Sequence, residues 1–190
     1  MQLLKDRIKK DGMVLSDTIL KVDKFINQQV DPLLMKKIGI EFANRFRGKK
    51  VDAIMTIEAG GIAPAVFVAL ELNVPLVVIK KGKSKTANDV YTSTVKSFTK
   101  NKVYDIVINK SILDKHSNVL FIDDFLAEGN AFIATQKLLE QANVTIEGIG
   151  IIIEKSFQAG RAQIEELGYD IYSLARIREM SPETGIIWED

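Results

Sequence analysis

The sequence predicts an α/β fold in which helices cover a parallel sheet. Short apolar runs, which favour buried strands, occupy residues 51–57, 74–79, 119–122 and 145–153. Nearly uninterrupted apolar strands are typical of parallel sheets buried on both faces. Segments with helical periodicity lie between the runs, as in strand–helix units. We therefore expect one domain over residues 1–190, with ligands bound at the carboxyl ends of its strands.

Composition limits the chemistry that the chain can perform. Its 190 residues suffice for one substantial core, and 46% hydrophobic with 27% charged residues is ordinary for a globular protein. The chain has no cysteine and one histidine, His116, which argues against disulfides, thiolate catalysis, Cys/His zinc sites and histidine triads. His116 lies in a polar stretch, and we expect it to be solvated. Because 26 Lys and Arg face 25 Asp and Glu, no basic excess favours a nucleic-acid partner.

No membrane partner is expected either. The first residues, MQLLKDRIKKDG, are charged and lack the apolar core of a signal peptide. The apolar stretch 60–79 is interrupted by Pro64, Glu71, Asn73 and Pro75, so it does not read as a membrane span. We therefore expect a cytoplasmic protein.

In the first half of the chain, the sequence predicts two strands that alternate with two helices. The expected elements are a helix over Pro32–Arg47, a strand over Val51–Ile57, a loop over Glu58–Gly61, a helix over Ala63–Leu72 and a strand over Val74–Ile79. The two glycines of the loop allow its backbone to approach a ligand closely.

Residues 80–102, KKGKSKTANDVYTSTVKSFTKNK, do not fit the strand–helix repeat. The segment contains seven lysines and is rich in Ser and Thr. Tyr91, Ser93 and Val95 have the two-residue spacing of one strand face. We expect a polar β-hairpin that is also a mobile lid, because long polar insertions in compact domains are commonly lids.

The motif VLFIDDFLAEGNA, Val119 to Ala131, carries the chemistry. A buried strand ends in Asp123 and Asp124, and a small-residue loop then leads into a helix that opens near Phe132. Backbone N–H groups and the positive end of the helix dipole favour a phosphate at the loop. The carboxylates can accept hydrogen bonds from hydroxyl groups, provided that the chain curls so that both reach one ligand. The combination predicts a sugar phosphate.

This motif resembles the phosphoribosyl-pyrophosphate (PRPP) motif of the type I phosphoribosyltransferases. The resemblance implies that Asp123 and Asp124 hold the ribose hydroxyls. It also implies a 5′-phosphate loop made of Ala127, Glu128, Gly129, Asn130 and Ala131. The common family pattern has Thr, Gly and Thr where this chain has Glu128, Asn130 and Ala131. We expect Glu128 to point to solvent, and Gly129 and Asn130 to permit a left-handed turn.

The resemblance assigns further residues to the substrates. It implies a pyrophosphate loop made of Glu58, Ala59, Gly60 and Gly61. Of the two cations Lys80 and Lys81, it favours Lys81 for the pyrophosphate, with Lys83 and Lys85 on the lid. In the subgroup that acts on xanthine, Lys155 of the EKSF sequence contacts the base, as do Leu20 and Asn27. Residues 1–35 would form a small hood over the base.

The resemblance thus implies a purine-salvage enzyme, which transfers phosphoribose from PRPP to xanthine. Mg²⁺ would be carried by PRPP, with no metal ligand directly from the protein, and the enzyme would be a homodimer. An adenine or a hypoxanthine–guanine phosphoribosyltransferase is the alternative. A regulator that senses PRPP or nucleotides without catalysis is a further alternative, although such proteins need a surface for nucleic acid.

Overall fold

The computed structural model describes residues 1–82, 89–97 and 102–189. In these ranges a central sheet of eight strands has the order β10-β9-β8-β7-β3-β4-β6-β5. Its parallel strands are β3 (Ala53–Ile57), β4 (Leu76–Lys81), β7 (Asn118–Leu126), β8 (Thr145–Lys155) and β9 (Ile171–Ser181). The antiparallel strands at its two edges are β5 (Val90–Ser97), β6 (Lys102–Asn109) and β10 (Gly185–Trp188). The predicted α/β class with a parallel core is confirmed.

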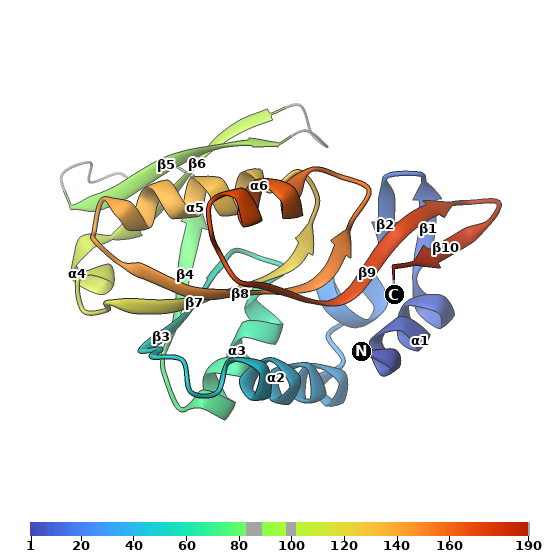
Figure 1. Cartoon of the computed structure of the whole chain (residues 1–190), viewed down its shortest axis with the longest axis horizontal. Coiled ribbons are helices and arrows are strands. Elements are labelled where there is room, and N and C mark those ends of the chain that lie inside the picture. Colours follow the sequence, from blue (N-terminus) through green and yellow to red (C-terminus); the bar gives the residue numbers. More distant parts are fainter. Residues whose placement is uncertain (83–88, 98–101, 190) are drawn as a thin grey trace.

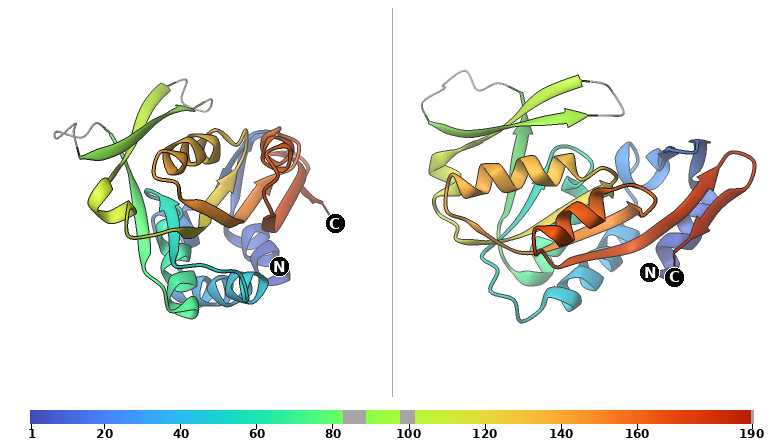
Figure 2. Two further views of the ribbon diagram at one scale, coloured as in Figure 1. Left: turned by 60° about the vertical axis from the view of Figure 1, so that its left-hand side comes forward. Right: turned by 45° about the horizontal axis from the view of Figure 1, so that its top comes forward.

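Helices cover both faces of the sheet (Figures 1 and 2). One face carries α2 (Pro32–Phe46) and α3 (Ile62–Leu72), and the other carries α5 (Asn130–Glu140) and α6 (Gly160–Glu166). The short α4 (Lys110–Leu113) joins β6 to β7. Two separate clusters of buried apolar side chains correspond to the two layers. This double burial explains why the parallel strands are nearly continuous runs of apolar residues.

Helix α2 illustrates how the sequence fixes an element. Asp31 caps the helix, since its carboxylate accepts hydrogen bonds from the N–H groups of Leu33 (3.0 Å) and Leu34 (3.1 Å). Pro32 at the first helical position lacks an N–H that would need a partner there.

Two glycines of β8 let α2 pack closely on the sheet. A Cβ atom at Gly148 would lie 2.5 Å from the Phe46 ring, and one at Gly150 would lie 2.8 Å from the Phe42 ring. Both distances are far below van der Waals contact, so larger residues there would push the helix away.

The N-terminal residues form a small unit beside β9. It comprises α1 (Gln2–Asp11), the antiparallel pair β1 (Met13–Ser16) and β2 (Ile19–Lys21), and the π-helix η1 (Asp23–Asn27). Figure 1 shows the unit next to β9 and β10, at one end of the molecule.

The structure changes three details of the expectation. The motif strand, expected over residues 119–122, continues to Leu126, so the acidic pair lies inside β7. A hairpin is present, but only its first strand, β5, lies within the expected range 80–102, because β6 runs from Lys102 to Asn109. Lys83, Lys85 and the rest of 83–88 and 98–101 lie outside the described residues. His116 is only partly solvated: its side chain is 14% exposed, and Nδ1 lies 3.4 Å from a carboxylate oxygen of Asp52.

None of the helices in the described ranges has both the length and the apolar composition that crossing a bilayer requires.

Candidate active site

A small cavity of about 160 Å³ lies where β3, β4 and β7 approach their carboxyl ends. Its walls contain both members of the acidic pair, part of the glycine loop and one of the two candidate cations. The lining residues are Ile57, Glu58, Ala59, Gly60, Lys81, Tyr104, Asp123, Asp124 and Ala131. The tertiary structure therefore brings together residues that lie more than sixty positions apart in the chain.

The glycine loop packs directly against the acidic pair. A Cβ atom on Gly60 would overlap the carboxylate of Asp124, and one on Gly61 would overlap Oγ1 of the buried Thr56 and lie 3.1 Å from Oδ1 of Asp123. These glycines are therefore needed to seat the carboxylates. Their expected approach to a ligand remains a prediction. The peptide bond between Glu58 and Ala59 is cis.

Glu58 ties the glycine loop to the end of β4. Its carboxylate accepts a hydrogen bond from the backbone N–H of Lys81 at 2.6 Å and pairs with the ammonium group of Lys80 at 3.0 Å. The bond from the Lys81 backbone is the main cause that lowers the pKa of Glu58, against a smaller opposing effect of burial. Successive strand residues point to opposite faces. The Lys80 side chain accordingly contacts Glu58 of the glycine loop, while the Lys81 side chain lines the cavity.

Burial raises the pKa of both carboxyl groups of the acidic pair. For Asp123, repulsion by the neighbouring Asp124 raises it further. The N–H of Asp124 donates to Oδ1 of Asp123, and the N–H of Phe125 donates to Oδ1 of Asp124, both at 3.0 Å. The expected curl of the chain at this point is wrong, because Asp123 stays paired in register with Ile151 of β8. Both side chains nevertheless line the small cavity.

A larger cavity of about 380 Å³ adjoins the first and shares Tyr104, Asp123 and Ala131 with it. The whole predicted phosphate loop, 127–131, lies in its wall. The further lining residues are Thr18, Val95, Lys96, Phe121, Phe125, Leu126, Phe132, Ile151 and Gln158.

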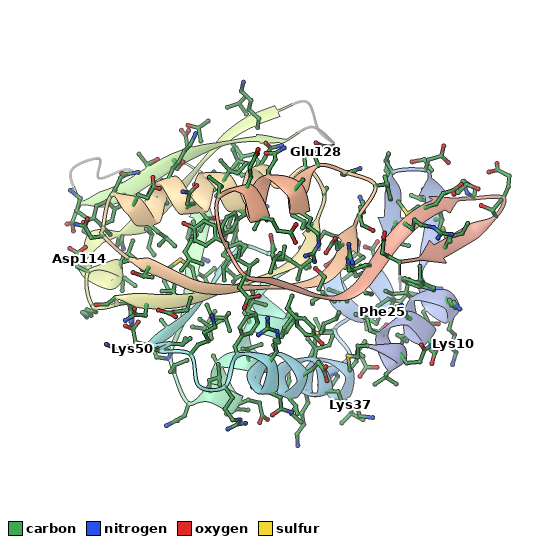
Figure 3. All side chains as sticks on the ribbon, viewed as in Figure 1. Lys10, Phe25, Lys37, Lys50, Asp114 and Glu128 are labelled. Atoms are coloured by element: carbon green, nitrogen blue, oxygen red, sulfur yellow. The ribbon has the colours of Figure 1, made fainter. Side chains whose placement is uncertain are left out.

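The phosphate loop differs from expectation at two positions. Gly129 has the left-handed conformation, with φ at +80°, and caps α5, as predicted. Asn130 is instead the first residue of that helix, and so it takes no part in a left-handed turn. Glu128, labelled in Figure 3, is partly buried in the cavity wall rather than fully turned to solvent.

Gly160, at the start of α6, supports the phosphate loop from behind. Its N–H donates to the carbonyl oxygen of Ala127 at 3.0 Å, and a Cβ atom at this position would lie 2.9 Å from the nitrogen of Gly129. Sequence reasoning missed this residue, although a glycine that opens a helix just after the EKSF sequence was a visible signal.

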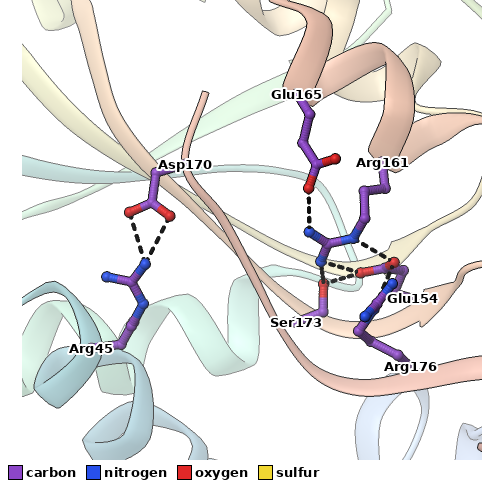
Figure 4. Close-up of polar contacts among 7 residues, drawn as sticks. All are labelled: Arg45, Glu154, Arg161, Glu165, Asp170, Ser173 and Arg176. Atoms are coloured by element: carbon purple, nitrogen blue, oxygen red, sulfur yellow. Dashed lines mark hydrogen bonds and ion pairs between the residues drawn. The ribbon is translucent and has the colours of Figure 1, made fainter. Parts of the chain in front are cut away.

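A buried ion-pair network anchors the end of β8 to α6 and β9 (Figure 4). Glu154 is 1% exposed. Its carboxylate accepts hydrogen bonds from Arg161 at 2.7 and 2.8 Å and from Arg176 at 3.1 Å, with a further bond from the hydroxyl of Ser173. Burial by itself raises the pKa of Glu154, but the arginines and Ser173 outweigh it and lower the value. The network fixes the segment that carries both Lys155 and Gly160.

Lys155 ends β8 and reaches the N-terminal unit. Its ammonium group donates to the carbonyl oxygen of Thr18 at 2.6 Å and lies 5.4 Å from the centre of the Phe125 ring. Burial lowers the pKa of Lys155, and the charge of Asp124 opposes this. Thr18 and Phe125 both line the larger cavity. Lys155 therefore contacts two residues of the cavity lining.

The other two predicted base contacts are less well placed. Leu20 is 7% exposed in β2, and Asn27 is exposed at the end of η1. Within the described ranges neither one lines the two cavities. The sequence reasoning had also missed Tyr104, Thr18, Phe125 and Gln158 as cavity residues. Phe125 had a visible signal, since it directly follows the acidic pair.

This arrangement of sheet, acidic pair and helix-capping loop defines a class of protein. Residues 28–175 match the family model of the phosphoribosyl transferase domain. The chain belongs to the type I phosphoribosyltransferase family.

Curated relatives of similar length share about half of their residues with this chain. The xanthine phosphoribosyltransferase of Agathobacter rectalis is 52% identical over 181 residues, which cover 95% of this chain and 94% of the relative. Xanthine phosphoribosyltransferase 1 of Clostridium botulinum is 49% identical over 95% of both chains. The xanthine phosphoribosyltransferase of Stutzerimonas stutzeri is 50% identical over 95% of this chain and 96% of its own.

Solved structures share the fold at lower identity. The adenine phosphoribosyltransferase of Thermoanaerobacter pseudethanolicus superposes with a TM-score of 0.73 at 25% identity, covering 91% of this chain and 99% of its own. The enzyme of Giardia lamblia complexed with 9-deazaadenine gives 0.76 at 21% identity, covering 91% and 97%.

Proposed function

We propose that this enzyme transfers the 5-phosphoribosyl group from PRPP to xanthine, giving xanthosine 5′-monophosphate and pyrophosphate in purine salvage. The observation that carries the proposal is the convergence of Asp123, Asp124 and Lys81 in one cavity that opens beside the loop 127–131. The relatives that share half of its residues are named for xanthine, which supports the choice of base.

The two cavities would bind different parts of PRPP. The loop 127–131, at the N-terminus of α5, offers backbone N–H groups to the 5′-phosphate. Asp123 and Asp124 accept hydrogen bonds from the ribose hydroxyls. The glycine loop and Lys81 receive the pyrophosphate, at the opposite side of the ribose.

In this reaction the protein orients the base against C1′ of PRPP and compensates the charges that develop. A nitrogen of the base forms the bond to C1′ while the bond between C1′ and the pyrophosphate oxygen breaks, and the electron pair leaves with pyrophosphate. The base gives up one ring N–H proton, which the leaving pyrophosphate can accept. The carboxylates of the acidic pair favour the positive charge that develops on the ribose ring. Lys81 neutralises the leaving group, and the two cavities align the reacting atoms. No side-chain nucleophile is required.

The donor set fits Mg²⁺ that arrives on PRPP. In the described residues no group of three or more His, Cys, Asp and Glu side chains could form a metal cage. Mg²⁺ commonly keeps several waters and is bound by one or two carboxylates together with substrate phosphates. Asp123 and Asp124 would accept hydrogen bonds from the waters of an ion that PRPP itself coordinates, and the ion would supply positive charge to the leaving pyrophosphate.

Lys155 is the proposed donor to the 6-oxo group of the base, because a lysine ammonium can only donate. Its bond to Thr18 places the N-terminal unit beside the larger cavity, which supports the role of residues 1–35 as a hood with Leu20 and Asn27. The homodimer, the lid around 80–102 and the cytoplasmic location remain predictions of the sequence.

One assay tests the function. The enzyme is incubated with PRPP, Mg²⁺ and, in turn, xanthine, guanine, hypoxanthine and adenine, and kcat/KM is measured for each base. We expect the highest value with xanthine. If adenine were the best substrate, the choice of base would be wrong while the PRPP site would stand, and if no base reacted, the enzymatic function itself would be refuted.

A further inference from the structure

Tyr104 lies at the junction of the two cavities. It lines both of them, together with Asp123 and Ala131. Burial and the charge of Asp123 raise the pKa of its phenol, which favours the neutral form of the side chain. A neutral ring at this point can contact a cation through its face.

The pairing of β4 with β6 fixes Tyr104 next to Lys81. In this antiparallel pair Lys81 stands opposite Ile106. Tyr104 lies two residues before Ile106 on the same face of β6, and such diagonal neighbours are within reach of long and aromatic side chains. The ammonium nitrogen of Lys81 is indeed 5.3 Å from the centre of the Tyr104 ring. The contact therefore follows from the register of the sheet.

We propose that Tyr104 is a positioning residue that holds the ammonium group of Lys81 at the pyrophosphate side of the site. This inference rests on the proposed role of Lys81. A lysine side chain has many rotamers, and restricting them on substrate binding costs free energy. The ring restricts them before PRPP arrives and excludes water from one side of the cation, which strengthens its attraction for the diphosphate.

The hairpin offers a matched control. On β5, Tyr91 holds the ammonium group of Lys110 at 5.4 Å from its ring centre, and it also donates a hydrogen bond to Asp114. Tyr91 lines neither cavity in the part of the chain that the structure describes. Tyr91→Leu therefore removes a comparable ring-to-lysine contact from the same hairpin without touching the site.

The experiment is steady-state kinetics in both directions. Because Lys81 is exposed, we expect Tyr104→Leu to raise the KM for PRPP and for pyrophosphate about twofold to fivefold, the size of an exposed cation–π contact, and to leave the KM for xanthine unchanged. Tyr104→Phe keeps the ring and should retain the parent values. With 4-cyanophenylalanine at position 104, which keeps the shape but withdraws electrons from the ring face, KM for PRPP should lie between those of the Phe and Leu variants.

A double-mutant cycle separates positioning from general damage. If both residues act through the same contact, Tyr104→Leu should add little to the loss caused by Lys81→Met. Fully additive losses would overturn the proposal, as would Tyr104→Phe behaving like Tyr104→Leu, or Tyr91→Leu raising KM equally. Should Tyr104→Leu fail to fold, the comparison of phenylalanine with its 4-cyano analogue decides instead, and equal KM values would refute the proposal.

The cycle also separates failure of this inference from failure of the proposed function. If Lys81→Met raises the KM for PRPP while Tyr104→Leu does not, Tyr104 has no positioning role and the role of Lys81 stands. If Lys81→Met itself leaves the KM unchanged, the assignment of Lys81 to pyrophosphate is wrong.

Discussion

The carboxylates of Asp123 and Asp124 have room in the structure because the neighbouring residues Gly60 and Gly61 have no Cβ atoms. The acidic pair sits against Gly60 and Gly61, where added Cβ atoms would overlap the carboxylate of Asp124 and the hydroxyl of Thr56. Each carboxylate also accepts a hydrogen bond from the next N–H along β7. Burial raises the pKa of both carboxyl groups, although the charge of Lys81 opposes this, and carboxyl groups with perturbed pKa values are common at functional sites.

Asp123→Asn and Asp124→Asn should therefore leave the fold intact and weaken PRPP binding. A lost hydrogen bond to a charged acceptor costs about 1.5–3 kcal/mol, which is roughly a tenfold to hundredfold fall in kcat/KM for PRPP. Steady-state kinetics and thermal unfolding check the two expectations. Asp114→Asn, at a carboxylate that bonds to Tyr91 outside both cavities, serves as control. Full activity of both site variants would refute the ribose assignment.

We also expect single side chains to decide base choice. Lys155→Ala removes the proposed donor to the 6-oxo group, so kcat/KM should fall for xanthine, guanine and hypoxanthine and change least for adenine. We propose that the Asn27 amide donates to the 2-oxo group of xanthine, so Asn27→Ala should narrow the difference in kcat/KM between xanthine and hypoxanthine. Lys50→Ala, at an exposed lysine (Figure 3), is the control. An unchanged ranking in both site variants would remove these residues from the base site.

At the scale of elements, the joint between β8 and α6 links the two halves of the site. Glu154 binds Arg161 of α6 while the next residue, Lys155, bonds to Thr18 of the N-terminal unit. Gly160 of α6 in turn contacts the phosphate loop through Ala127. The buried carboxylate of Glu154 thus ties β8, which ends in Lys155, to α6, whose Gly160 contacts the predicted phosphate loop.

Glu154→Gln should lower the free energy of unfolding by about 2–3 kcal/mol, since arginines at a buried site lose a charged partner. The pKa of Glu154 is lower in the folded state than in the unfolded state, where it is ordinarily 4.5. The carboxylate therefore contributes its full share to the free energy of unfolding above pH 4.5, and this share is lost as the pH falls through the folded-state pKa. Chemical unfolding of parent and variant at pH 7 and pH 3 measures this. A stability difference that stayed constant with pH would contradict the charge-based explanation, and Glu165→Gln, at the exposed partner of Arg161, should cost far less.

At the scale of the whole molecule, one helical face leaves apolar side chains exposed. Leu33 and Ile40 on α2, and Val66 and Leu70 on α3, are 73%, 37%, 47% and 69% exposed. The two helices pack closely, with a Cβ atom at Gly39 calculated to lie 2.7 Å from Cβ of Phe67. Large apolar side chains exposed on two packed helices are candidates for an interface.

We expect a homodimer that uses this face. Sedimentation equilibrium at micromolar concentration should give twice the chain mass of 21.2 kDa. Leu70→Glu should shift the population to monomer, because a dimer would have to bury the new charge unpaired. Val103→Glu, at an exposed apolar residue of β6, is the control. A parent protein that sediments as a monomer would refute the homodimer.

The sequence by itself determined the parallel strands β3, β4, β7 and β8, and it predicts which residues carry the chemistry. Apolar runs revealed the parallel strands because strands buried on both faces need no polar alternation. The two aspartates and Gly129 were visible because a strand, an acidic pair and a helix-capping glycine form one local motif, which folds through contacts between near neighbours.

Only the tertiary structure decided how distant residues meet. The extension of β7 through the acidic pair depends on pairing with β8, and the seat of the carboxylates depends on glycines sixty residues earlier. The register of β6 on β4 places Tyr104 in the site, and the pairing of β8 with β9 places Arg176 next to Glu154. Such contacts arise from packing between elements far apart in the chain, and local sequence patterns do not encode that packing.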